Sequence, residues 1–122
     1  MTHAYAAAQR ATLEGRALER EVLLRIAARI EAADTGAPGG VAMLARALDD
    51  NRRLWEAFAT DLAKPRNPYP DALKGGLIGL AAFVARHTPA VLREEVGPGA
   101  LVEINRNVAR GLGVLIPDAA AA

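Results

Sequence analysis

The chain has 122 residues, of which 52% are apolar and 24% are charged, a composition typical of one folded domain rather than a disordered segment. The formal net charge is +1, so bulk charge gives no support to a role on nucleic acid or on a membrane surface. Cysteine is absent, which excludes disulfide bonds, thiolate catalysis and cysteine-based metal sites. Aromatic residues make up only 4%, so the core must be built from aliphatic side chains and alanine, which favours closely packed helices.

The N-terminal residues show no basic stretch followed by an apolar one, so they lack the pattern of a secretory signal. The longest run of small and apolar residues, 75–85, is shorter than the roughly 20 residues that a transmembrane helix needs. The sequence therefore predicts a soluble cytoplasmic protein that does not engage a membrane.

The first predicted helix covers about residues 16–33, where Leu23, Ile26 and Ile30 recur at helical spacing. A short lead segment, 1–15, precedes it; this segment is rich in alanine and compatible with helix, and Gly15 favours a break between the two. The glycine- and proline-containing residues 34–40 then predict a helix end and a linker.

The second predicted helix covers about residues 41–63, and its apolar stripe is interrupted only by Asn51. Trp55 and Phe58 lie on the same stripe. The helix must end before residues 64–70, because this segment contains three prolines. The segment, which includes Tyr69, is either a docking edge or a stiff connector between two helices.

The third predicted helix begins near Pro70, and its apolar stripe contains His87. Pro89 is expected to kink this helix or to split off a short last piece. Three glycines at positions 75, 76 and 79 lie inside the helix, where glycine is unfavourable. The favoured explanation is the close approach of another helix of the same chain, and the alternative is a helix of a partner protein.

The fourth predicted helix covers about residues 100–110, with Asn105 on its apolar stripe and Gly111 as the residue that ends it. An apolar and alanine-rich tail, 113–122, follows. The connections are short, so neighbouring helices should be antiparallel. The sequence thus predicts an all-α fold, a compact antiparallel bundle of four to five helices that forms a single domain over residues 1–122.

No enzyme chemistry is visible. His87 has only apolar neighbours one helical turn away, so a structural role is favoured over a general base or a metal ligand. The carboxylates near Asp49 alternate with arginines at helical neighbour distance, which is typical of surface ion pairs. The sequence therefore predicts no catalytic residue and no metal site.

Asn51 and Asn105 occupy positions where a helix stripe normally has a hydrophobic residue, and each is followed by an arginine, Arg52 or Arg106. One interpretation is a buried polar pair that fixes helix register, which physical reasoning alone favours. Since His87 interrupts a third stripe, Asn51, His87 and Asn105 are predicted to share one polar network. The other interpretation is that the amides and arginines line a groove for a partner.

The sequence resembles the FlaF family of flagellar biosynthesis regulators from alphaproteobacteria. The resemblance covers about residues 3–112 and rests on four groups of residues in the family's order. These are Tyr5, Arg16, Glu19 and Leu23; then Leu48, Asn51, Arg52, Leu54, Trp55 and Asp61; then Leu80, Phe83, Val84, His87 and Thr88; and finally Leu101, Ile104, Asn105, Arg106, Gly111 and Leu112. The chain departs from the family before Arg16, where Glu14 and Gly15 replace the usual proline or serine.

The resemblance implies a helical cytoplasmic protein needed for flagellin production and secretion, without enzyme activity or cofactor. It implies flagellin as a partner, with the protein acting as a secretion chaperone or assembly factor, and a link to the translational regulator FlbT. The alternative is a post-transcriptional regulator of flagellin mRNA acting with FlbT; scarce aromatics and low net charge make direct binding to nucleic acid unfavourable.

These implications predict a groove formed by the second, third and fourth helices. Trp55 and Phe58 are the candidate anchors for a flagellin segment, although a position in the core is the favoured interpretation of Trp55. Asn51 and Asn105 are placed at the base of this groove, and Arg52 and Arg106 at its surface. The six residues form the predicted partner-binding site.

Overall fold

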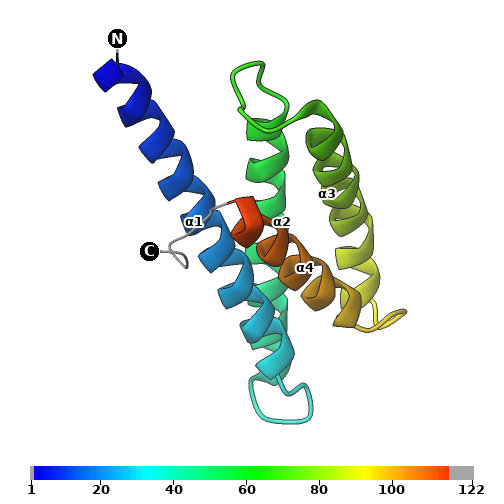
Figure 1. The fold of residues 1–122 in the computed structure, drawn as a ribbon. Helices are drawn as coiled ribbons and strands as arrows, with labels where there is room; N and C mark the ends of the chain where they lie inside the picture. Colours follow the sequence, from blue (N-terminus) through cyan, green and yellow to red (C-terminus); the bar gives the residue numbers. More distant parts are fainter. Residues whose placement is uncertain (1, 116–122) are drawn as a thin grey trace.

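In a computed structural model of the protein, the backbone is described for residues 2–115 and the side chains for residues 15–112. The described chain folds into four helices, which are α1 (Thr2–Ala32), α2 (Gly40–Leu62), α3 (Asp71–Leu92) and α4 (Gly99–Leu115). Over this range it contains no strand. The prediction of a compact all-α bundle is confirmed (Figure 1).

The four helices associate as two pairs. Helix α4 packs mainly against α1, and α3 packs mainly against α2 in the opposite direction, while α1 and α2 join the pairs (Figure 1). Helices α3 and α4 approach each other at few positions. The bundle is therefore well packed at three of its helix–helix interfaces and loosely packed at the fourth, between α3 and α4.

The core lies where α1, α2 and α4 meet and continues between α2 and α3. Its largest fully buried side chains come from all four helices, and they are Leu23, Ile30, Leu48, Asn51, Trp55, Leu62, Val84, Leu101 and Asn105. The stripes predicted from helical spacing supply these residues, because one face of each amphipathic helix is covered by its neighbours. Two asparagines thus sit among aliphatic side chains.

The first helix differs from the prediction at its start. Helix α1 runs from Thr2 through Gly15 without interruption, so the expected break is absent. One glycine in a long helix lowers its stability only modestly, and the alanine-rich lead segment has high helix propensity. The linker after α1 was predicted correctly, and α2 begins at Gly40 after Gly39, which has a positive φ of 77°.

Pro89 does not split α3, which continues to Leu92. The buried Thr88 does not start a new helix either, because its hydroxyl donates to the Val84 carbonyl oxygen at 2.7 Å. The helix ends in a Schellman-type turn, in which the N–H groups of Glu94 and Glu95 bond to Val91 and Ala90. Since Pro89 lies in the last turn, its lost hydrogen bond affects little of the helix.

Helix α4 also continues beyond its predicted end. It extends to Leu115, so Gly111 lies inside the helix and is not the residue that ends it. The prediction failed because glycine marks helix ends only as a tendency. The whole predicted tail, 113–122, lies outside the residues whose side chains are described.

Helix α3 is unusually apolar for its position. Among the described residues it is the one helix long and apolar enough to cross a bilayer, with a mean hydropathy of 1.3 over an 18-residue window. Core helices of soluble proteins pass the same test, but only 22% of this window is buried. Helix α3 therefore presents more apolar surface than the bundle covers.

Candidate functional site: a polar core network and an open apolar groove

A hydrogen-bonded cluster centred on Asn105 joins three helices. The Asn105 side chain accepts from the Trp55 indole Nε1 at 2.9 Å and donates to the Asn51 Oδ1 at 2.7 Å. It also donates to the main-chain oxygen of Leu23 at 3.3 Å. Both asparagines are fully buried, so these bonds replace water that the amides lost on folding. The cluster ties α4 to α2 and α1.

His87 lies outside this cluster, which corrects the prediction of a network through Asn51, His87 and Asn105. Its ring stacks on Phe83 with centroids 4.8 Å apart, and its Nε2 has no hydrogen-bond partner. The neighbouring Thr88 is buried, whereas His87 is only partly buried. Within the described residues, α3 makes no side-chain hydrogen bond to another helix.

The predicted anchors and amides are not accessible to a partner in this structure. Trp55 is 1% exposed and Phe58 is 6% exposed, while Asn51 and Asn105 have no exposed surface. Trp55 and Phe58 contact each other, with ring centroids 5.7 Å apart. Trp55 thus has the core role that helical spacing favoured, and within the described residues no groove opens onto these four side chains.

The two remaining predicted site residues are engaged by carboxylates of the chain itself. Arg52 bonds to Asp49 and Glu56 on α2, at 3.0 and 2.9 Å. Arg106 forms a bidentate pair with Glu31 at 2.8 and 2.9 Å, which links α4 to the end of α1. The Arg106 guanidinium lowers the pKa of Glu31 from its ordinary value. A partner that contacts either arginine would have to compete with these pairs.

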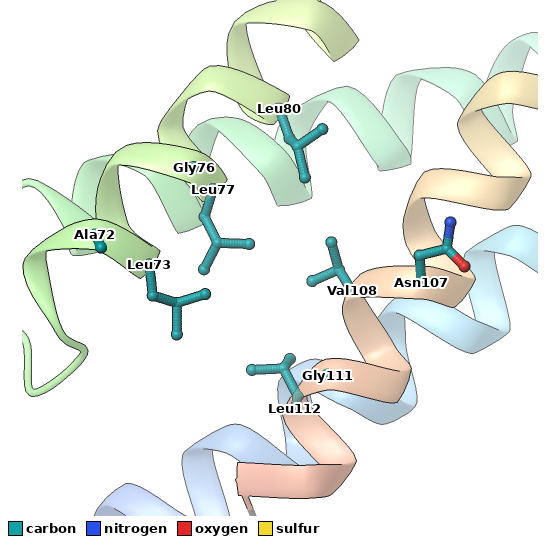
Figure 2. A pocket seen from close by; sticks show the side chains of 9 residues that line it. All are labelled: Ala72, Leu73, Gly76, Leu77, Leu80, Asn107, Val108, Gly111 and Leu112. Carbon is teal, nitrogen blue, oxygen red and sulfur yellow. The ribbon is translucent and has the colours of Figure 1, made fainter.

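An open apolar groove lies between α3 and α4. Its volume is about 600 Å³. Figure 2 shows the leucine side chains of α3 pointing across this space towards Val108 and Leu112 of α4. The lining residues are Ala72, Leu73, Gly76, Leu77, Leu80, Asn107, Val108, Gly111 and Leu112. We call this feature the α3–α4 groove. It lies between two of the three helices of the predicted groove, but none of the six predicted site residues lines it.

The glycines inside α3 do not serve close packing within the chain. A Cβ atom built at Gly75, Gly76 or Gly79 would meet no atom of the described residues within 4 Å, so no helix in that part of the chain packs against them. This result overturns the favoured explanation from the sequence. Each glycine destabilises a helix interior by about 1 kcal/mol relative to alanine. The fold by itself offers no reason for this cost.

A second polar cluster, which helical spacing in the sequence does not predict, connects α1 with the loop before α3. The Tyr69 hydroxyl donates to Glu19 at 3.0 Å, and the Arg16 guanidinium lies 4.7 Å from the centre of the Tyr69 ring. Tyr69 is buried, so residues 64–70 act as a connector packed against α1 at this point. Burial raises the pKa of the Glu19 carboxyl, against the opposing effect of the Tyr69 hydrogen bond.

The raised pKa of Glu19 predicts a pH effect on stability. A carboxyl group whose folded pKa is raised stabilises the fold below its unfolded value, near 4.5, and loses this contribution as pH rises through the folded value. Glu19→Gln stays neutral and can still accept from Tyr69. We therefore expect the stability of the variant relative to wild type to increase between pH 4 and pH 7. Urea unfolding at several pH values measures this change, and parallel pH profiles would contradict it.

The described residues contain no group of three histidine, cysteine or acidic side chains able to hold a metal ion. What they define is a small helical protein with a hydrogen-bonded polar cluster in its core and an open apolar groove between α3 and α4. Its sequence matches the family model described as "Flagellar protein FlaF" over residues 1–112. The chain belongs to the FlaF family of flagellar proteins, which is not a known enzyme family. Searches of curated proteins and of solved structures found no match.

Proposed function

We propose that the protein binds flagellin in the cytoplasm before export, as a secretion chaperone or assembly factor. The observation that carries this proposal is the α3–α4 groove, an open apolar channel in a member of a flagellar family. The terminal segments of flagellin are amphipathic and unfolded before export. An amphipathic helix laid in an apolar groove is a common way for a small domain to cover such a segment.

The attachment of α3 is suited to this role. The asparagine cluster fixes α1, α2 and α4 to one another, whereas the described part of α3 contacts the other helices through apolar packing alone. Apolar contacts have no fixed direction, so one wall of the groove can adjust to a bound segment more easily than the polar core can. The rigid wall, α4, sets the position of the segment.

The alternative, control of flagellin mRNA together with FlbT, receives less support. The arginines that could form an RNA-binding face are largely paired with carboxylates, as in Arg25–Glu21, Arg29–Asp50 and Arg53–Asp49. Such pairs lower the positive potential that phosphates require. A gel shift on flagellin mRNA that weakens strongly with added salt would favour the alternative over the chaperone function.

We expect purified flagellin monomers to bind the protein with a negative change in heat capacity, because binding covers apolar surface on both partners. Isothermal titration calorimetry at several temperatures measures this quantity. The control is Arg53→Ala, which changes an exposed residue of α2 away from the groove and should leave binding intact. If flagellin gives neither heat nor a co-eluting complex, alone or with FlbT present, the protein is not a flagellin chaperone.

A further inference from the structure

The lining of the α3–α4 groove is suited to a partner that packs closely against it through apolar contacts. On the α3 side its lining alternates leucines with small residues, and the side chains shown in Figure 2 leave the space between the helices open. None of the nine lining residues carries a charge. The occupant must therefore be apolar over the whole face that enters the groove.

Two glycines face this space from different helices. Gly76 of α3 and Gly111 of α4 both line the groove, and a Cβ atom on either would meet no atom within 4 Å among the residues that the structure describes. Both lie inside helices that would be more stable with alanine at these positions. Glycine allows another backbone to approach a helix closely, as in helix crossings with small residues at the contact.

The edge of the groove carries an uncompensated positive charge. Arg110 donates a hydrogen bond to the side chain of Asn107, a lining residue, and this contact places the guanidinium at the rim on α4. Within the described residues Arg110 has no ion-pair partner, unlike Arg106 one turn earlier. A carboxylate on a bound partner would form an ion pair with Arg110 at this edge.

We propose that the groove seats one α-helix of flagellin with its backbone close to Gly76 and Gly111. This inference rests on the proposed function and specifies the partner's chemistry. The helix has an apolar face with small residues at the crossing point and an aspartate or glutamate that pairs with Arg110. Affinity for flagellin then depends on the open space beside Gly76 and Gly111. The fold of the protein alone does not require glycine at these two positions.

The test compares Gly76→Leu with Gly79→Leu, using purified flagellin as the probe. Both substitutions replace a glycine of α3 whose Cβ position is open, but only Gly76 lines the groove. Gly76→Leu should weaken flagellin binding about tenfold or more, because the side chain occupies the seat of the helix. Gly79→Leu should bind like wild type, and both variants should keep wild-type helicity and unfold at a higher temperature.

A charge reversal tests the rim separately. Arg110→Glu should weaken binding about fivefold at low salt, since an attraction at the rim is replaced by a repulsion, and added salt should narrow the difference from wild type. Arg86→Glu makes the same change on an exposed residue of α3 that does not line the groove, and it should bind like wild type.

The outcomes separate this inference from the function on which it rests. Wild-type protein that does not bind flagellin would refute the chaperone function itself. Wild-type binding that Gly76→Leu leaves unchanged would refute the groove as the seat of the helix while the chaperone function stands. Equal losses in Gly76→Leu and Gly79→Leu would also refute the seat, because the effect would not depend on the lining position.

Discussion

Asn105→Leu is expected to lower the free energy of unfolding by about 3 kcal/mol, as measured by urea denaturation. The side chain of Asn105 makes three hydrogen bonds in the core, and leucine leaves the Trp55 indole and the Asn51 carbonyl without a partner. It also removes the additional bond to the Leu23 main-chain oxygen, which keeps its helical bond within α1. Each buried polar group left unpaired costs about 1 kcal/mol or more. The loss of unfolding free energy should therefore exceed that of a core substitution that changes only the shape of a side chain.

Asn51→Leu is the matched control and should cost about 1 kcal/mol. Asn51 accepts one hydrogen bond from Asn105, while its own Nδ2 has no partner. Replacing Asn51 removes that unpaired donor and leaves Asn105 still bonded to Trp55 and Leu23. Equal losses for the two variants would contradict a cluster centred on Asn105.

The different bonding of Asn105 and Asn51 shows which features of the core can be predicted from the sequence. Helical spacing placed Asn51 and Asn105 on apolar stripes, and from this position a buried polar pair followed. Spacing along one helix does not give the height or rotation at which two helices meet. For that reason His87 was assigned to a network that it does not join, and the bond between Trp55 and Asn105 was not foreseen.

The partner surface was harder to predict than the fold, for a similar reason. Trp55 and Phe58 are candidate anchors on the sequence alone, because large aromatic side chains are common at interfaces. Whether a stripe faces the core or an open groove depends on the distances between helices, which the sequence does not state. The α3 glycines did carry a signal, since their cost in a helix indicated a close approach, but no helix in the described part of the chain makes that approach.

The linker between α1 and α2 leads to the second large effect, at Gly40. A Cβ atom at this position would lie 1.6 Å from the main-chain oxygen of Asp34 and 2.5 Å from its carbonyl carbon. These are backbone atoms, so no side-chain rotation relieves the overlap. The turn is held by the bonds from the Ala37 N–H to Asp34 and from the Gly40 N–H to Ala37, both 3.0 Å. Any substitution must displace this turn and the start of α2.

Gly40→Ala should therefore lower the free energy of unfolding by about 3 kcal/mol, the upper part of the range for overpacked sites. Thermal and urea unfolding both measure this loss. Gly99→Ala is the matched control, because Gly99 is also the first residue of a helix and a Cβ there would meet nothing within 4 Å. The control should match or slightly exceed wild type in stability, because alanine favours the helix. Equal behaviour of the two variants would mean that the turn can move away from α2 at little cost.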